Sequence, residues 1–126
     1  MHRSRVYALI VDAAADDAVA AQQFWSAALG APIRTSTEEP QFASLVEAFP
    51  DLVVAVQSVD DTPRYHLDIE TDDVEAEVTR LTGLGATPVS QYLECHVLRA
   101  PSGHLLCVLP VESPAELFEA QARTWP

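Results

Sequence analysis

The chain contains an internal repeat, and this repeat constrains the fold more than any other feature. Asp16-Asp17-Ala18, a run of helix-forming residues and Leu29-Gly30-Ala31 recur as Asp72-Asp73-Val74, a second such run and Leu84-Gly85-Ala86. Each copy follows an apolar, strand-like segment and precedes further strand-like segments. Two copies are too few for a solenoid, in which each repeat stacks on several neighbours. The sequence therefore predicts one domain built from two similar modules that close around a shared cleft.

Each module is predicted to follow the order βαβββ, which gives an α+β fold. Module one covers residues 5–60, with strands at 6–11, 33–37, 41–47 and 52–59 and a helix that begins at Asp16 or Asp17 and stops at Gly30. Module two covers residues 64–110, with strands at 65–70, 87–92, 94–100 and 104–109 and a helix between Asp72 and Gly85. Asp72 and Glu75 resemble a capping box at the start of that helix. A ferredoxin-like fold is disfavoured because each module has three strands after its helix.

Ser113-Pro114-Ala115-Glu116 predicts a third helix, over residues 113–124. Serine is a good cap residue, and proline is favoured at the first helical position. The apolar side chains of this helix are expected to pack on the domain or across a dimer.

Composition indicates a single soluble domain over residues 1–126. With 48% apolar residues, 126 residues can bury a sizeable core. No apolar run reaches the length of a membrane span, and Cys95 and Cys107 fit a reducing compartment. We therefore expect a cytoplasmic protein.

The net charge of −12, from 19 acidic and 7 basic residues, argues against a nucleic-acid partner, because phosphate binding needs a basic surface. An acidic surface attracts cationic ligands, although the acidic residues can also serve solubility alone.

His66 is the best candidate for a functional residue. Side chains alternate along a strand, so His66, Asp68 and Glu70 share one face, and Leu67 and Ile69 share the other. The apolar face must pack against the helices, which leaves the polar face to line a solvated cleft. The alternative is that His66 is an ordinary pocket histidine.

The paired modules resemble the vicinal oxygen chelate superfamily, which includes glyoxalase I, extradiol dioxygenases and bleomycin-resistance proteins. The segments that carry the resemblance are Phe24-Trp25 to Leu29-Gly30, Tyr65-His66-Leu67-Asp68, Asp72-Asp73-Val74 to Leu84-Gly85-Ala86, and Val97 to Gly103 with Leu106-Cys107-Val108. They are most similar to the glyoxalase-like group, and the resemblance covers residues 6–109. It implies a small-molecule cleft but selects no reaction, because the superfamily contains isomerases, lyases, dioxygenases and non-catalytic drug binders.

The resemblance also implies up to four metal ligands, from the first and last strands of each module. His66 occupies one such position, Cys107 stands where a glutamate is usual, and Gln57 occupies the closing strand of module one. The first strand offers Tyr7, Ala8, Ile10 or Val11, of which only Tyr7 has a donor atom. This set is poor for a hard divalent ion and marginal for zinc. A divalent metal is therefore disfavoured, with His66 the main candidate ligand and Gln57, Cys107 and Tyr7 weak ones.

Substrate contacts are expected from side chains around the same cleft. Either Trp25 or Phe24 could form an aromatic wall together with Tyr92, although core packing is the default role for these residues. A two-residue loop in the last hairpin would place His96 opposite Cys107, and a loop longer by one residue would turn His96 away. The complete set of expected substrate-binding residues is Tyr7, Trp25, Gln57, Glu70, Tyr92, His96 and Cys107.

These observations leave three functional hypotheses. The favoured one, on family base rates, is a glyoxalase-like enzyme of the lyase or isomerase type that uses His66 as general base, with Asp68 or Glu70 orienting it. The second is a non-catalytic binder of the bleomycin-resistance type, for a cationic drug or metabolite. The third is a regulatory or structural protein without a tight ligand. Because superfamily members often dimerise, the resemblance also implies a homodimer, with the C-terminal helix as a candidate contact.

Overall fold

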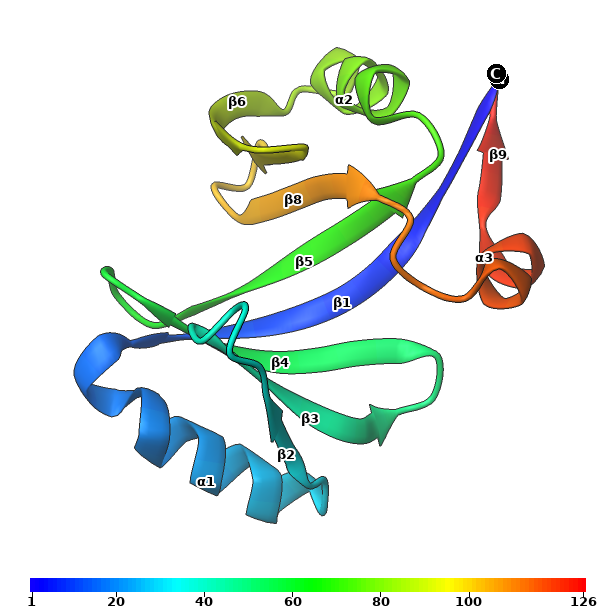
Figure 1. Cartoon of the computed structure of the whole chain (residues 1–126). Coiled ribbons are helices and arrows are strands. Elements are labelled where there is room, and N and C mark those ends of the chain that lie inside the picture. Colours follow the sequence, from blue (N-terminus) through cyan, green and yellow to red (C-terminus); the bar gives the residue numbers. More distant parts are fainter. The chain divides into compact units, whose positions relative to one another are not determined.

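The computed structural model describes all residues, Met1–Pro126, and confirms the α+β class. In chain order the elements are β1 (His2–Ala14), a 3-10 turn (Ala15–Asp17), α1 (Ala18–Leu29), β2 (Ile33–Thr35), β3 (Phe42–Phe49), β4 (Leu52–Val59), β5 (Arg64–Thr71), α2 (Val74–Gly83), β6 (Thr87–Tyr92), β7 (Cys95–Arg99), β8 (Leu105–Pro110), α3 (Ala115–Gln121) and β9 (Arg123–Trp125) (Figure 1). The α-helices lack the combination of length and apolar character that a membrane span requires.

The chain forms two compact units. We call residues Ala8–His66 the N-terminal unit, and residues Met1–Tyr7 together with Leu67–Pro126 the C-terminal unit. Strand β1 contributes its first residues to the C-terminal unit and the rest to the N-terminal unit.

In the N-terminal unit, β4 pairs in parallel with β1 and antiparallel with β3, and β2 extends the sheet from β3. Helix α1 lies along one face of β3 and β4 (Figure 1). Leu45, Val54 and Val56 are buried in the core between them, and Trp25 packs at its edge. Gly30, with φ of 64°, ends α1 in the left-handed conformation that glycine adopts without strain, as predicted.

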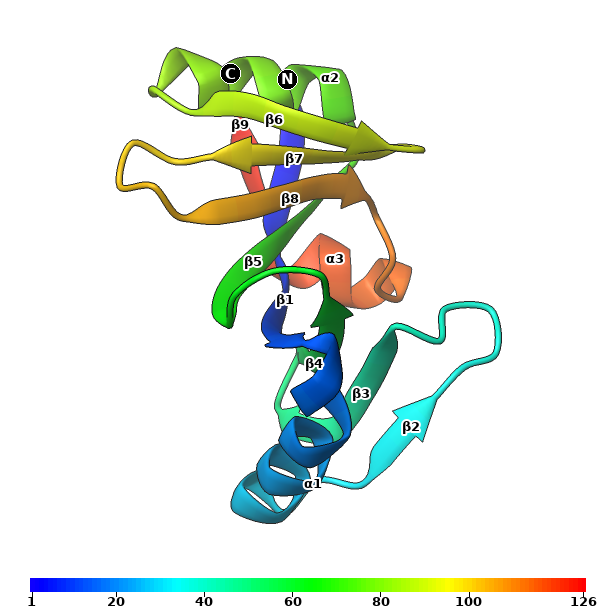
Figure 2. The ribbon, with the colours of Figure 1, turned by 90° about the vertical axis from the view of Figure 1, so that its left-hand side faces the viewer.

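In the C-terminal unit, β5 pairs in parallel with β8, and β8, β7 and β6 are successive antiparallel neighbours (Figure 2). Three strands therefore follow the helix in each module, which confirms the βαβββ order. Asp73, not the predicted Asp72, caps α2 by accepting a hydrogen bond from the Ala76 backbone N–H at 3.0 Å. Asp72 is engaged instead by Arg3, whose backbone N–H and Nε both donate to it.

The C-terminal helix is shorter than expected because the chain turns into a strand. Helix α3 ends at Gln121, Ala122 is extended, and β9 pairs antiparallel with the start of β1, with His2 opposite Trp125. The Trp125 Nε1–H donates to Ser4 Oγ at 2.8 Å. Phe118 is buried in its own unit, with the Arg3 guanidinium 5.3 Å from its ring centroid.

The last hairpin adopts the longer-loop register. Val97 lies opposite Cys107, and His96 lies opposite Val108. Because side chains alternate, His96 points to the face opposite that of Cys107. The sequence alone left this orientation open.

Candidate functional site

Asp12 is a buried carboxylate on the sheet face of the N-terminal unit that is turned away from α1. Val11 and Ala13 pack with the core beside α1, so Asp12, between them, points to the opposite face. Its register partner on β4 is Gln57, a half-buried residue on that same face. The sheet therefore presents a carboxylate and an amide side by side.

His66 binds Asp12 directly. Its Nδ1 lies 2.7 Å from Asp12 Oδ2, and the two residues are only 9% and 2% exposed. Because a carboxylate only accepts hydrogen bonds, Nδ1 carries a proton, and in the neutral ring Nε2 carries the lone pair. The pair thus fixes both the orientation and the tautomer of the imidazole, as carboxylates do for catalytic histidines.

Arg64 completes this cluster. Its Nε lies 3.3 Å from Asp12 Oδ2, and its Nη1 donates to Asp61 Oδ2 at 2.7 Å. The hydrogen bond to Asp61 is the main cause that raises the pKa of Arg64, and it lowers the pKa of Asp61. The second carboxylate oxygen of Asp12, Oδ1, is buried without a hydrogen-bond partner. A buried acceptor without a donor costs about 1–3 kcal/mol, so its presence needs an explanation.

A cavity of about 270 Å³ lies beside this cluster, within the N-terminal unit. Asp12, Arg64, Trp25 and Tyr65 are among the residues that line it. Charged and aromatic residues that line one cavity are typical of a small-molecule site, and His66 is not among the lining residues. Trp25 lines this cavity, whereas Phe24 is 62% exposed and its ring forms a T-shaped pair with that of Trp25.

A second group of polar side chains lies in the C-terminal unit. Asp68 on β5 is the register partner of Cys107 on β8, and Cys95 on β7 shares their face because Val97, two residues later, lies opposite Cys107. The thiol of Cys107 interacts with both Cys95 and Asp68. The hydrogen bond with Cys95, followed by burial and the nearby negative charges, raises the pKa of Cys107 far above its usual value. Tyr7 is half-buried on β1, on the same strand face as Arg5.

Glu70 was predicted to contact substrate, but its side chain is fully buried and forms hydrogen bonds with other residues of the protein. Its Oε1 accepts hydrogen bonds from the backbone N–H groups of Glu112 and Ser113, and its Oε2 accepts from Arg5 and from the Ser113 hydroxyl. Burial acts to raise the pKa of Glu70, but these hydrogen bonds outweigh it and hold the pKa below its usual value. Glu70 therefore anchors the segment that follows β8.

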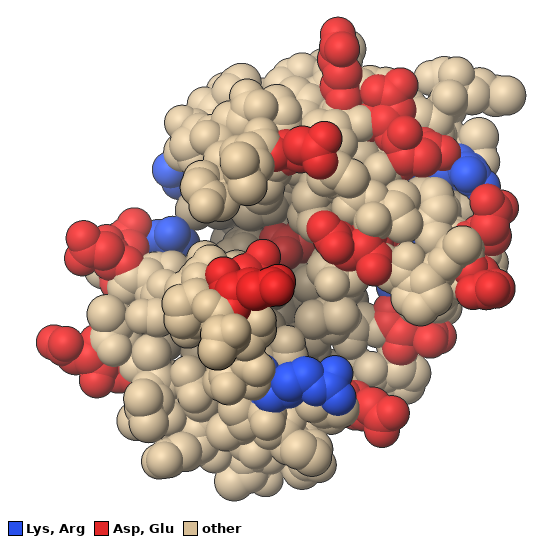
Figure 3. Space-filling view, in the orientation of Figure 1, with Lys and Arg blue, Asp and Glu red and all other residues tan.

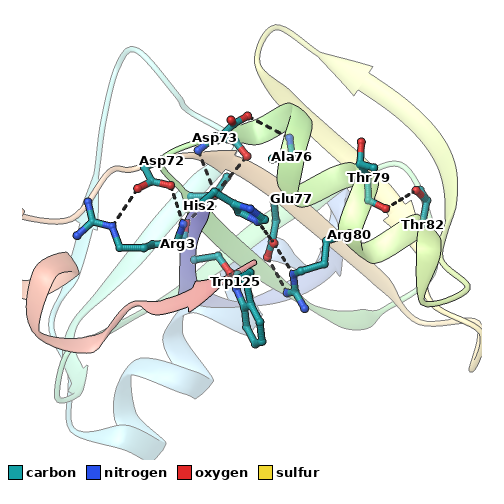
Figure 4. Close-up of polar contacts among 12 residues, drawn as sticks. His2, Arg3, Asp72, Asp73, Ala76, Glu77, Thr79, Arg80, Thr82 and Trp125 are labelled. Atoms are coloured by element: carbon teal, nitrogen blue, oxygen red, sulfur yellow. Dashed lines mark hydrogen bonds and ion pairs between the residues drawn. The ribbon is translucent and has the colours of Figure 1, made fainter.

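Glu77 forms a similar buried cluster at the chain ends (Figure 4). Its carboxylate lies 2.8 Å from His2 Nε2 and accepts two hydrogen bonds from Arg80, whose guanidinium stacks on the Trp125 ring at 3.8 Å. Burial would raise the pKa of Glu77, yet the hydrogen bonds, led by the one from Arg80, lower it to about 2. This cluster joins α2 to β1 and β9.

The remaining predicted residues lie elsewhere in the C-terminal unit. Tyr92 is 75% exposed on β6. His96 lines a separate cavity of about 440 Å³ beside α2. His96 does not join the group around Cys107, whereas Tyr92 is the register partner of Cys95 and shares its sheet face.

Asp12 and Arg64 were not among the residues predicted from the sequence. The first strand was predicted to end at Val11, whereas β1 continues to Ala14. Extending the alternation Ala8, Ile10, Asp12 by one step would have indicated that a carboxylate shares the face of the expected site. Arg64 directly precedes the predicted strand at 65–70 and had no comparable pattern.

Comparison with known proteins supports the architecture. A family model described as glyoxalase-like domain matches residues 8–109. The chain belongs to this family. No curated protein has a sequence that matches this glyoxalase-like domain.

Solved structures show the same fold at low sequence identity. An NAD-dependent benzaldehyde dehydrogenase structure from Legionella pneumophila is 12% identical, with a TM-score of 0.57 over 82% of this chain and 99% of that one. A Streptomyces coelicolor methylmalonyl-CoA epimerase variant, in complex with 2-nitronate-propionyl-CoA, is 20% identical, with a TM-score of 0.54 over 87% and 98%. A glyoxalase/bleomycin resistance protein/dioxygenase superfamily member from Vibrio splendidus is 17% identical, with a TM-score of 0.54 over 83% and 97%. Such identities establish a shared fold and not a shared reaction.

The metal implied by the superfamily does not fit the donors of the N-terminal unit. Asp12 is already paired with the Arg64 guanidinium, which would repel a divalent cation, and Gln57 offers only a neutral oxygen. The Ala8 and Ile10 side chains, which share the face of Asp12, have no donor atom. We therefore derive no step through a metal at His66.

Proposed function

We propose that this glyoxalase-like domain binds a small carbonyl compound and moves a proton at the carbon next to the carbonyl, with His66 as general base. The buried pair between His66 Nδ1 and Asp12 Oδ2 supports this proposal. A histidine oriented by a carboxylate is suited to proton transfer near neutral pH.

In this reaction Nε2 of His66 removes the proton, and the imidazolium that forms is stabilised by the Asp12 carboxylate. Returning the proton to either face of the carbon leaves the atom and electron count unchanged, so the net result is an isomerisation. Asp12 orients the His66 imidazole. From the sequence, this role was predicted for Asp68 or Glu70. Arg64, which lines the cavity beside Asp12, is placed to bind an anionic group.

The similar epimerase structures are consistent with such chemistry, because an epimerase by definition inverts one stereocentre. The support is limited to the shared fold. The dyad of His66 and Asp12 is the observation particular to this chain.

Deuterium exchange tests the proposal directly. The protein is incubated in D2O with a panel of 2-oxo acids, 2-hydroxyketones and acyl-CoA thioesters that includes methylmalonyl-CoA, and deuterium at carbon is followed by mass spectrometry. We expect catalysed exchange for at least one compound, a loss of about 10²–10⁴-fold in His66→Ala, and a smaller loss in Asp12→Asn. His104→Ala is the matched control, because His104 is exposed on the last hairpin and bonds Ser102. Exchange that survives in His66→Ala would disprove the assignment.

The second candidate is a non-catalytic binder of a cationic drug or metabolite. The net charge is −12, and acidic side chains outnumber basic ones on the face shown in Figure 3. Bleomycin is a suitable probe. Saturable, salt-sensitive binding that Asp12→Asn weakens, together with no exchange on any panel compound, would favour this function over the enzyme.

A homodimer in the cytoplasm remains part of the proposal. Light scattering after size exclusion would measure the oligomeric state. Since Phe118 is buried within its own unit, a dimer through α3 would have to use the polar side of that helix.

A further inference from the structure

Helix α1 is apolar on both sides, although only one side packs in the core of the N-terminal unit. Trp25 and Leu29 lie on the inner side, against the core residues of β3 and β4. The outer face of α1, as we call the exposed side, consists of Val19, Ala20, Gln23, Phe24, Ala27 and Ala28. Val19 and Phe24 are 65% and 62% exposed. A helix that is apolar all round is normally buried all round, so this face lacks the cover that its composition calls for.

The corresponding helix of the second module has the polar surface that α1 lacks. Glu75 and Thr79 are exposed on α2, and Thr79 is the counterpart of Phe24 when Gly85 is aligned with Gly30. Residues 18–33 contain no charged side chain, and this is the longest such stretch in a chain whose net charge is −12. Figure 3 shows mostly uncharged side chains where Figure 1 places α1. The outer face of α1 is therefore an exception on an acidic surface.

We propose that the outer face of α1 packs antiparallel against the same face of a second copy of the chain, across a two-fold axis. The inference rests on the homodimer proposed above and names its contact. Val19 and Phe24 supply the apolar area, and Ala20 and Ala27 are small enough to let the two helices approach closely. In a two-fold interface one patch meets itself, so each of these residues contributes twice.

The distribution of charge selects both the occupant and the orientation. Two chains of net charge −12 repel each other, so they associate best through a face on which no like charges meet. Asp16 and Asp17 are exposed just before α1, and parallel pairing would bring them against the same residues of the second copy. Antiparallel pairing separates the two acidic ends by the length of the helix, about 18 Å for 12 residues. This distance exceeds the Debye length of about 8 Å at physiological salt.

A lipid surface suits the outer face of α1 less well than a second copy does. Helices that lie on membranes carry Lys or Arg on their polar side, and these residues attract anionic headgroups. Helix α1 has no basic residue, and acidic residues precede it.

The proposed contact lies next to the cavity of the N-terminal unit. The Phe24 ring forms a T-shaped pair with the Trp25 ring, with 5.2 Å between the centroids, and Trp25 lines the cavity. A second copy that covers Phe24 therefore changes the surroundings of Trp25. Tryptophan fluorescence can report this change.

Sedimentation equilibrium over a concentration series tests the contact. One helix face per copy is a small interface, so we expect a dimer with a dissociation constant in the micromolar range. Phe24→Glu and Ala20→Glu each place two like charges in the contact and should weaken association by about 100-fold or more. Thr79→Glu is the matched control, because it adds the same charge to the exposed side of α2 and should leave the dissociation constant unchanged. Added NaCl should strengthen association by screening the repulsion between the acidic chains.

Fluorescence checks the location of the contact. In a Trp125→Phe background Trp25 is the single tryptophan, because the chain has two. Its emission maximum should shift over the concentrations at which the dimer forms, and the shift should be absent in Ala20→Glu. Circular dichroism confirms that each variant is folded.

The results separate failure of this contact from failure of the homodimer. A dimer that persists in folded Phe24→Glu and Ala20→Glu, or that NaCl weakens, would overturn the contact through α1 alone. A parent protein that stays monomeric throughout the series would overturn the homodimer as well. Cosedimentation of a monomeric parent with phosphatidylcholine vesicles, lost in Phe24→Glu, would assign the outer face of α1 to a lipid surface. None of these results bears on the proposed proton transfer, which is read from deuterium exchange.

Discussion

The buried carboxylates of Glu70 and Glu77, in the C-terminal unit, differ from that of Asp12, in the N-terminal unit, in their hydrogen bonds. In the C-terminal unit every carboxylate oxygen of Glu70 and Glu77 has at least one hydrogen-bond donor. In the N-terminal unit Asp12 is almost as deeply buried, yet its Oδ1 has none. Buried polar groups are normally satisfied, so complete satisfaction indicates a structural role, whereas an unsatisfied buried acceptor calls for another explanation.

The largest loss of stability is expected on substitution of Glu77. Glu77→Ala leaves His2 and Arg80 without their buried partner and should lower the free energy of unfolding by about 3–5 kcal/mol. Urea unfolding followed by circular dichroism measures the change. Glu75→Ala, an exposed position on the same helix, is the control and should stay within about 0.5 kcal/mol. Equal effects for the two variants would contradict a structural role for the Glu77 cluster.

Acid should weaken the same cluster. The pKa of Glu77 is about 2 in the folded protein, against an ordinary value of 4.5. A depressed folded pKa gives stability that is fully present above pH 4.5 and is lost as the pH falls towards 2, worth about 3 kcal/mol in total. Glu70 and Asp72, whose pKa values are also lowered, act in the same direction.

The check is the urea midpoint of the parent protein and of Glu77→Gln at pH 5 and pH 3. The parent should lose more stability than the variant over this interval, because glutamine does not titrate. Parallel losses would assign the acid sensitivity to other groups.

A hydrogen bond between uncharged groups in the C-terminal unit should contribute less to the free energy of unfolding than the Glu77 cluster does. Trp125→Phe removes the hydrogen bond to Ser4 Oγ while keeping an aromatic ring beside Arg80. We expect a loss of about 1 kcal/mol in the free energy of unfolding. A loss near that of Glu77→Ala would mean that ring packing, and not buried charge, holds the chain ends together.

The smallest effect on stability is expected at Asp12. Asp12→Asn keeps an acceptor for His66 and should change the free energy of unfolding by less than about 1 kcal/mol, while ligand binding or exchange falls. Thermal unfolding measures the change in stability and the exchange assay measures the loss of function, both on the same preparation of the variant. Strong destabilisation without a functional loss would place Asp12 with the structural carboxylates and remove the contrast between the units.

The repeat and the alternation of side chains were enough to predict the architecture. Three strands follow each helix, and β4 was placed at its observed bounds. These features are local or periodic, so they can be read along the chain. The C-terminal helix was extended too far, because the pairing of Trp125 with His2 brings together residues from opposite ends of the sequence.

The contacts of the candidate site were predicted only in part for the same reason. His66 was proposed from its strand, but its partner Asp12 lies 54 positions away, and the ion pair of His2 with Glu77 spans 75 positions. The orientation of His96 depended on the length of the last hairpin loop, because a change of one residue turns the side chain to the other face of the sheet. Pairings of this kind follow from the tertiary structure and leave no periodic pattern in the sequence.

Strand β1 belongs to both units, and this has a consequence for the order in which the protein folds. Residues Ala8–Ala14 pair with β4, whereas His2–Ser4 pair with Arg123–Trp125, which are synthesised much later. The start of β1 therefore lacks its β9 partner until that strand has been made. Long-range pairing of this kind slows folding. A pause in synthesis before Arg123 would leave the start of β1 without its β9 partner and open to chaperones or proteases.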